Sequence, residues 1–224
     1  MIVLAVETAQ AGGSVAVRNG GRVAAGRTLA DGKTQAEQLL PVIAATLAEA
    51  GLRYADIGLL AVGIGPGLFT GVRVGIAAVR GLRLVLKVPA IGIGTLHAVA
   101  VRAIADLRAG ESLYVVNDAR NDEVYAQAFS ASATPHADAV LLPLRDASRA
   151  LPADAVLLGS AAALVAPYVA RPVRVLTGFG AADAGTIAAL AEARAALPEF
   201  RDPGAPRPLY VRKPHARTLE EARR

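Results

Sequence analysis

The chain contains no cysteine among its 224 residues, and aromatic residues make up only 4% of it. The missing cysteines exclude disulfide bridges, thiolate metal sites and cysteine nucleophiles. No uninterrupted apolar run reaches the ~18 residues of a membrane-spanning helix, because Arg73, Arg80 and Arg83 interrupt the nearest candidate. The first residues, MIVLAVET, have no basic start and reach Glu7 early, so they predict a strand and no signal peptide. We therefore expect a soluble cytoplasmic protein that does not contact membranes.

Small apolar side chains dominate the composition of the sequence. Apolar residues account for 54% of the chain, well above a typical soluble protein. Much of this content is Ala, Val and Leu, which predicts a close-packed core of small side chains. The length suffices for one large domain or two small ones.

The formal net charge is +5, from 24 Lys and Arg against 19 Asp and Glu. Six of the basic residues lie at the end of the chain, in residues 206–224, beside only two acids. A basic segment can contact nucleic-acid phosphates. Because no aromatic residue follows Tyr210 in it and no nucleic-acid-binding motif is present, a solvated tail is the favoured interpretation. Any contact with RNA would then be indirect or weak.

The first half of the sequence predicts three strands, a helix, a strand and a helix. Apolar, β-branched runs indicate the strands, and apolar residues at helical spacing indicate the helices. Asn-Gly-Gly at 19–21 suits a hairpin turn with positive φ angles. Thr34 and Glu37 have capping-box spacing before the first helix, where Pro41 marks either a kink or the true first turn. The expected elements cover 2–7, 14–18, 22–28, 34–51, 57–64 and 70–87.

The second half repeats this order of elements, though not the residues. Its expected strands and helices cover 112–118, 123–130, 139–144, 146–151, 155–160, 161–170 and 185–197. Two such units around a central cleft are the architecture of actin-like ATPases and sugar kinases. We therefore predict an α/β protein with a duplicated actin-like/RNase H-like (ASKHA) fold of two βββαβα subdomains. Residues 1–105 and 106–205 would form the subdomains, and 206–224 the basic tail.

The stretch GIGPGLFTGVRVG, residues 63–75, places glycine turns between a strand and a helix. Free N–H groups and the positive end of the helix dipole would suit an anion at such a corner. However, no Lys-Ser/Thr pair follows as in a P-loop, and the dinucleotide fingerprint is absent too. Pro66 between Gly65 and Gly67 favours a rigid turn, with Thr70 as the helix N-cap. A structural corner is the favoured interpretation, and phosphate binding is the alternative.

The helix after this corner has one nearly bare side, because Gly71, Gly75 and Ala78 follow at helical spacing. An interior glycine costs about 1 kcal/mol relative to alanine, so close approach of another helix is expected. Packing on the chain's own sheet would also explain small residues. Yet the apolar residues cover more of the circumference than one sheet face can bury. We predict a protein interface here, edged by Arg73 and Arg80.

Five stretches stand in an order that resembles the TsaB (YeaZ-type) family: AVETAQAGGSVAV, QAEQLLP, GIGPGLFTGVRVGIAAVRGL, DARNDEVY and PLYVR. The resemblance runs from Met1 to about Lys213, and the combination is specific although each stretch alone is weak. It implies a degenerate actin-like ATPase that acts as a non-catalytic partner of the catalytic subunit TsaD. With TsaD and the small ATPase TsaE, such proteins support threonylcarbamoyl transfer from threonylcarbamoyl-AMP. The acceptor is N6 of adenosine at position 37, in tRNAs that read codons beginning with adenine.

The resemblance also implies where the partner binds. In the family, the helix after the glycine corner and the helix before it form the interface with TsaD. The residues implied here are Leu39, Leu40, Ile43, Gly71, Arg73, Gly75, Ala78 and Arg80. A heterodimer with TsaD is expected, and a homodimer through the same helices when the chain is alone.

Two departures from the family pattern weaken any nucleotide or metal site. This chain has Glu7-Thr8-Ala9 where the family commonly has Asp-Thr-Ser, and Gln35-Ala36-Glu37 where it often has His-Ser-Glu. The first strand of each half ends in an acid, Glu7 or Asp118. These two acids would mark a vestigial nucleotide cleft. They would face each other there as acid and base, or else be ordinary polar strand ends, which is the favoured interpretation. We expect no cofactor.

Two alternative classes of function remain: an ATP-dependent small-molecule kinase of the same fold, and a glycoprotease-like metallopeptidase. A metallopeptidase would need clustered ligands, but His97, His136 and His215 are far apart and form no H-x-x-x-H pair. No G-x-S-x-G elbow is present either, and Ser160 is expected to cap a helix. We therefore predict a scaffold subunit without catalytic or metal-binding residues.

Overall fold

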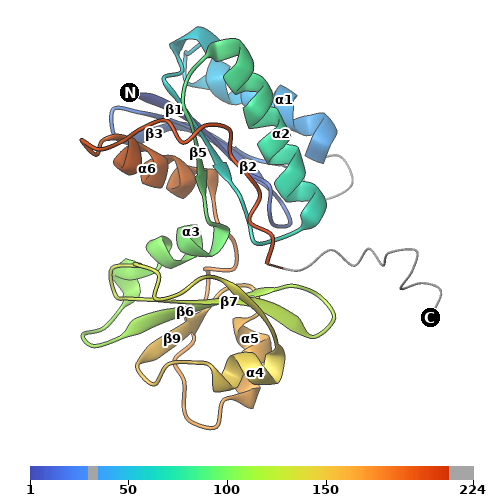
Figure 1. Cartoon of the computed structure of the whole chain (residues 1–224), viewed down its shortest axis with the longest axis vertical. Coiled ribbons are helices and arrows are strands. Elements are labelled where there is room, and N and C mark those ends of the chain that lie inside the picture. The colour runs from blue at the N-terminus through green and yellow to red at the C-terminus, as the bar shows by residue number, and fades with distance from the viewer. Residues whose placement is uncertain (30–34, 212–224) are drawn as a thin grey trace, which may run out of the picture.

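The structure is a computed structural model that describes residues 1–29 and 35–211. The predictions made for Thr34, for His215 and for the tail beyond Val211 lie outside the described residues. Figure 1 shows two halves, one above the other, each built on a β-sheet with helices on both faces.

The first sheet contains five strands in the order β3-β2-β1-β4-β5. β1 pairs antiparallel with β2 and parallel with β4, so the predicted antiparallel hairpins and parallel crossover are both present. The hairpin turn has Gly20 and Gly21 at positive φ, as predicted. The strands are β1 (Ile2–Glu7), β2 (Ser14–Asn19), β3 (Arg22–Thr28), β4 (Leu59–Gly63) and β5 (Ala90–Ile93).

Helices cover both faces of this sheet. α1 (Gln35–Glu49) and α2 (Phe69–Leu86) pack on one face, where they enclose Leu4 and Val6 of β1. α6 (Ala184–Ala195) packs on the other face, against Val3 and Ala5. Because successive side chains of a strand point to opposite faces, β1 contributes to both layers of core.

The second sheet contains four strands in the order β8-β7-β6-β9. Two short helices cover one of its faces and α3 covers the other. The strands are β6 (Ser112–Asp118), β7 (Glu123–Phe129), β8 (Val140–Pro143) and β9 (Ala155–Leu158). The helices are α3 (Thr95–Arg102), α4 (Leu144–Arg149) and α5 (Ala162–Val165), and the single 3₁₀ turns are η1 (Tyr54–Asp56), η2 (Ile104–Asp106) and η3 (Ala166–Tyr168).

The duplicated order βββαβα is therefore confirmed, with β5 and α3 added to the first unit. The predicted division at residue 105 separates the strands of the two sheets but not the helices. α3 lies before this point and packs on the second sheet, whereas α6 lies after it and packs on the first. Each sheet has an apolar face that needs cover, and the exchange provides it while joining the two halves.

Two local predictions need correction. Pro41 lies inside α1 and does not mark its first turn. α2 begins at Phe69 with Leu68 as its N-cap, and no side chain caps it, so Thr70 is not the N-cap. The reason is a tertiary contact: the Leu68 N–H donates to the Ala9 carbonyl at 2.7 Å, which fixes the chain before the helix.

Four glycines spaced four residues apart face the end of β1: Gly63, Gly67, Gly71 and Gly75. A Cβ on any of them would overlap atoms of the segment from Glu7 to Ala9. The Thr8 hydroxyl donates to the Gly71 carbonyl at 2.8 Å, a bond between helix and strand end that this closeness permits. Gly71 and Gly75 therefore allow α2 to approach the chain's own sheet. The inference that they admit a helix of another molecule is corrected.

The close approach predicts opposite effects for two glycines of the same helix. Gly71→Ala places a Cβ against the Thr8 backbone, and we expect it to lower the free energy of unfolding by about 1–3 kcal/mol. Gly81→Ala has nothing within 4 Å of the added Cβ, so it should raise stability by about 0.5–1 kcal/mol through helix propensity. Urea unfolding of both variants measures the difference, and equal effects would contradict the packing.

Candidate functional site

A cleft of about 220 Å³ lies where the carboxyl ends of the two sheets meet. Both halves line it, so it has the place of the central cleft expected for an actin-like fold. The lining residues are Ala9, Gln10, Ala11, Pro66, Gly67, Leu68, Asn117, Asp118, Arg120, Tyr125, Ser160, Gly180 and Ala181.

Asp118 lies on this cleft, at the exposed end of β6. Its carboxylate accepts the N–H of Arg120 at 2.8 Å, which closes a local turn. Its own N–H donates to the Ser160 hydroxyl at 3.0 Å. Ser160 therefore links the ends of β6 and β9, and the prediction that it caps a helix is wrong: α5 has Ala161 as its N-cap, with no side-chain cap.

Glu7 is almost fully buried and is not among the residues that line the cleft. One carboxylate oxygen accepts the N–H of Ala9, and the other accepts the Thr95 hydroxyl at 3.4 Å. The carboxylate occupies the space that a side chain at Gly63 would need. The structure therefore does not bring Glu7 and Asp118 together across the cleft, because the acid of β1 is turned into the protein.

Burial gives Glu7 unusual acid–base behaviour. Loss of solvation raises its pKa from 4.5 to about 7, although the hydrogen bonds from Ala9, Thr95 and Thr8 oppose the rise. Repulsion from Asp183 contributes in the same direction as burial. Near neutral pH this side chain therefore changes between a neutral and a charged form inside the first half.

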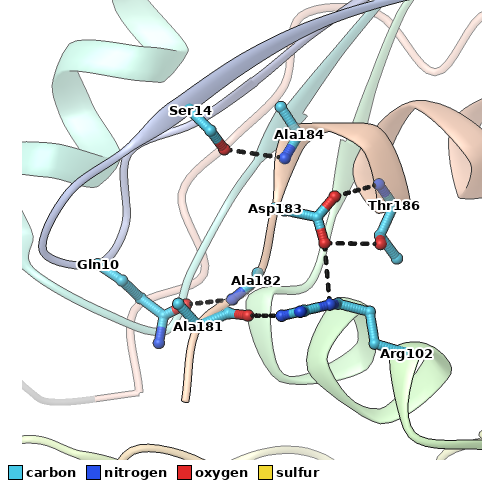
Figure 2. A network of polar contacts seen from close by, with 8 residues as sticks. All are labelled: Gln10, Ser14, Arg102, Ala181, Ala182, Asp183, Ala184 and Thr186. Carbon is cyan, nitrogen blue, oxygen red and sulfur yellow. Dashed lines mark hydrogen bonds and ion pairs between the residues drawn. The ribbon is translucent and has the colours of Figure 1, made fainter. Parts of the chain in front are cut away.

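Gln10 fixes one wall of the cleft (Figure 2). Its side-chain oxygen accepts the N–H of Ala182 at 2.7 Å, and its amide nitrogen donates to the Gly180 carbonyl at 3.2 Å. Both partners lie on the segment that returns from the second half to α6. The loop after β1 and this returning segment are thus held together by one side chain.

Arg102 holds the same returning segment from the side of α3 (Figure 2). It pairs with Asp183 at 3.0 Å and donates to the Ala181 carbonyl. Asp183 also caps α6, because its carboxylate accepts the Thr186 N–H at 2.8 Å. The N–H of Ala184, the residue after Asp183, donates to the Ser14 hydroxyl at 2.9 Å. These contacts connect the two halves beside the cleft.

Four of the predicted interface residues are inaccessible. Leu39 and Ile43 of α1 are buried in the core between the helices and the first sheet. Gly71 and Gly75 are buried against β1. The prediction that these four contact a partner is therefore corrected, since their burial within the chain leaves no surface to offer. Leu40 is 52% exposed, and it stays a prediction together with the half-buried Ala78.

Arg73 and Arg80 lie on one exposed stripe of α2, but both already bind the chain's own C-terminal segment, residues 200–211. The Arg73 Nε donates to the Tyr210 hydroxyl at 2.9 Å, and the Arg80 Nε donates to the Pro206 carbonyl at 2.8 Å. Arg83 forms an ion pair at 2.7 Å with Asp202 of the same segment. One flank of α2 is therefore covered by the segment, as Figure 1 shows.

The remaining exposed stripe of α2 is uncharged and includes residues that the sequence reasoning missed. Leu84 and Val85 are 76% and 78% exposed, the highest values among the large apolar side chains of the described residues. The other exposed members of the stripe are Thr70, Ala77 and Gly81. Helical spacing could have located this stripe in the sequence, because its positions lie on a different side of the helix axis from Gly71 and Gly75.

The described histidines hold no metal-binding arrangement. His97 stacks on Phe129 with ring centroids 6.0 Å apart, and burial lowers its pKa. His136 is exposed on the second half. Within residues 1–29 and 35–211, no group of three or more His, Asp or Glu side chains is placed to hold a metal ion. The same part of the chain contains no helix long and apolar enough to cross a membrane.

Comparison with known proteins identifies the family. The family described as TsaD, tRNA N6-adenosine threonylcarbamoyltransferase, matches residues 31–151. The tRNA threonylcarbamoyladenosine biosynthesis protein TsaB of Escherichia coli is 40% identical over 125 residues, which are 56% of this chain and 53% of that protein. The chain belongs to the TsaD family, and the curated TsaB proteins are among the members that it is similar to.

Further relatives agree with this assignment. TsaB of Haemophilus influenzae is 38% identical over 125 residues, 56% of this chain and 52% of that protein. The matched region spans about half the length of these curated TsaB relatives. YeaZ from Pseudomonas aeruginosa aligns over 93% of this chain and 100% of its own, with a TM-score of 0.78 and 28% identity. The predicted resemblance to the TsaB family and the actin-like fold are thereby confirmed.

The buried acid predicts a pH dependence of stability. Between pH 4.5 and about 7 the folded chain binds more protons at Glu7 than the unfolded chain does, so its stability falls as pH rises through this window. The full shift corresponds to about 3 kcal/mol at most. In Glu7→Gln, we expect the change in unfolding free energy between pH 5 and pH 8 to be smaller by up to that amount. The exposed Glu199→Gln is the control, and an unchanged slope in Glu7→Gln would contradict the assignment.

Proposed function

We propose that this chain is a non-catalytic subunit of the machinery that makes threonylcarbamoyladenosine in tRNA, and that it acts by binding the TsaD enzyme. In this role it supports TsaD and the ATPase TsaE during threonylcarbamoyl transfer from threonylcarbamoyl-AMP to N6 of adenosine 37. The names of the E. coli and H. influenzae relatives support the pathway. In the absence of TsaD, the chain forms a homodimer through the same surface.

The exposed face of α2 is the observation that carries the proposal. Leu84 and Val85 are more than three-quarters exposed, and neighbouring positions on the stripe are small and uncharged. Burying an exposed Leu or Val side chain stabilises a complex by about 1.5–3 kcal/mol. The interface therefore involves the stripe of α2 that the C-terminal segment leaves uncovered.

α1 extends this surface. It packs beside α2 on the same face of the first sheet (Figure 1). Its outward residues Ala36, Leu40, Ala44 and Ala48 recur every four positions and are all exposed. Such a stripe of small apolar residues permits close contact with a helix of the partner. Two adjacent helices with exposed apolar residues offer a broader contact than either would alone.

The cleft supports a subunit without catalysis of its own. Catalysis in this fold needs carboxylates that reach a metal-bound nucleotide, and here Glu7 is directed into the core. Asp118 reaches the cleft, but its carboxylate accepts a hydrogen bond within its own turn. No pair of acids is therefore assembled around the cleft by the described residues.

Charge on the α2 stripe should prevent the complex. We expect purified wild-type chain and TsaD from the same cell to elute together as a one-to-one complex in size-exclusion chromatography with light scattering. Leu84→Glu and Val85→Glu would each bury a charge in the interface and weaken binding by 100-fold or more. Leu164→Glu, on α5 of the second half and 51% exposed, is the matched control and should bind as wild type does.

The possible outcomes test the proposed function and the proposed location of the interface separately. No complex of the wild-type chain with TsaD would overturn the proposed function. A complex that both Leu84→Glu and Val85→Glu leave unchanged would show that the interface lies elsewhere. In the absence of TsaD, the same variants should shift a wild-type dimer to monomers at micromolar concentration, as light scattering measures directly.

A further inference from the structure

Two polar side chains of the second half lie next to each other on the wall of the cleft. Asn117 of β6 and Tyr125 of β7 are directly opposite in the antiparallel register, and both line the cleft. They are only 3% and 8% exposed. The Asn117 Nδ2 is buried without a hydrogen-bond partner, and the Tyr125 hydroxyl has none among the described residues. Because buried polar groups in proteins are nearly always paired, these two side chains point to a ligand that supplies the acceptors.

The backbone fixes the orientation of the Asn117 amide. The Ser160 N–H donates to the Asn117 Oδ1 at 3.1 Å, so the oxygen is engaged and the two Nδ2 hydrogens remain as donors. Gly159 permits this contact, because a Cβ at that position would lie 2.7 Å from Oδ1. The Tyr125 hydroxyl is a second donor on the same face of the sheet. Two adjacent donors suit the two oxygens of a carboxylate.

One acid and one base complete the polar part of the cleft. Asp118 and Arg120 are exposed, and among the described residues they are the only charged side chains that line it. Both belong to the turn between β6 and β7, in which Arg120, Asn121 and Asp122 have positive φ angles. The Arg120 N–H donates to the Asp118 carboxylate at 2.8 Å, so the turn holds both residues beside the cleft. The two charges of the lining therefore balance.

This balance favours one class of ligand. A nucleotide brings several negative charges, which Asp118 would repel and Arg120 alone would have to compensate. A free amino acid brings one positive and one negative group, which match these two side chains. The wall from the first half consists mainly of small apolar residues, among them Ala9, Ala11 and Pro66, and suits an apolar side chain. The cleft volume of about 220 Å³ is sufficient for a single amino acid.

We propose that the cleft binds a free α-amino acid in its zwitterionic form. The carboxylate of the ligand accepts hydrogen bonds from the Asn117 Nδ2 and the Tyr125 hydroxyl, and the charge of Arg120 adds to its attraction. The ammonium group of the ligand pairs with Asp118. Binding is non-covalent and involves no reaction. This inference goes beyond the proposed function, because it requires neither TsaD nor tRNA.

Thermal unfolding and calorimetry of the full-length chain test the proposal. Each of the twenty proteinogenic amino acids is added at millimolar concentration, and the one that stabilises most is titrated calorimetrically. We expect it to raise the unfolding midpoint by roughly 3–6 °C at ten times its Kd. Its N-acetyl derivative and its carboxamide each lack one of the two charges. Each should bind roughly 10- to 150-fold more weakly, because a hydrogen-bonded charge is lost.

Three substitutions change one proposed contact each. Asn117→Asp keeps the oxygen that accepts from Ser160 but replaces the donor with a second carboxylate oxygen. Tyr125→Phe removes only the hydroxyl, and Asp118→Asn removes only the negative charge. Each should weaken binding of the amino acid roughly 10- to 150-fold. Asp118→Asn should leave the weak binding of the N-acetyl derivative unchanged, since that derivative has no ammonium group to pair.

The chain offers matched controls for these variants. Tyr114 of β6 is 3% exposed, and its hydroxyl is buried without a partner, but it lies in the core on the other face of the same sheet. Tyr114→Phe should therefore bind the amino acid as wild type does. Asp138 is exposed and does not line the cleft, so Asp138→Asn controls for the loss of a negative charge. Unfolding midpoints without ligand show whether each variant is folded.

Three results would overturn the proposal. The first is a wild-type chain that none of the twenty amino acids stabilises or binds. The second is binding that the folded Asn117→Asp and Tyr125→Phe variants both retain unchanged. The third is binding of ADP by a chain that binds no amino acid, which would make the cleft a nucleotide site. The complex with TsaD is measured without added amino acid, so failure of the proposed function is distinguished from failure of this inference.

Discussion

The close approach of α2 to the end of β1 positions the glycine corner, the Glu7 carboxylate and the exposed sides of the helix. It requires that Gly63, Gly67, Gly71 and Gly75 have no side chains, since each would overlap the segment from Glu7 to Ala9. The bond from the Thr8 hydroxyl to the Gly71 carbonyl and the bond from the Leu68 N–H to the Ala9 carbonyl both depend on this closeness. Because one side of α2 packs on the sheet, the directions of its other sides are fixed. The position of the glycine turn before α2, which forms one wall of the cleft, is fixed as well.

The same closeness determines the state of Glu7. The missing side chain at Gly63 leaves room for the carboxylate, which turns inward and is satisfied by Ala9 and Thr95. In an actin-like fold the acid at this strand end is the natural candidate for a catalytic role in the cleft. Here it is a buried group whose pKa is raised to about 7, and Asp118 is the one acid among the described residues that line the cleft. Among the described residues, the cleft is therefore lined by one acid and not by a pair.

The three sides of α2 have different surroundings. Glycine and apolar positions meet the sheet, the flank with Arg73, Arg80 and Arg83 binds the C-terminal segment, and the stripe ending in Leu84 and Val85 faces water. This division explains how one helix can be apolar over most of its surface and still carry an arginine-rich flank. The uncovered stripe is the surface that we propose for the contact with TsaD.

The order of elements, the hairpin at 19–21, the duplicated fold and the family could be predicted from the amino-acid sequence, because these follow from local periodicity and from motifs in fixed order. The sequence also predicted an interface through Gly71 and Gly75 of α2, but these residues pack on β1, since spacing shows which residues share a face and not what that face contacts. The sequence could not predict that Gly71 and Gly75 pack on β1, that α3 packs on the second sheet and α6 on the first, or that Phe69 contacts Tyr210. Each of these contacts joins segments far apart in the chain, and their packing is decided by which apolar faces remain to be covered once all the elements are in place.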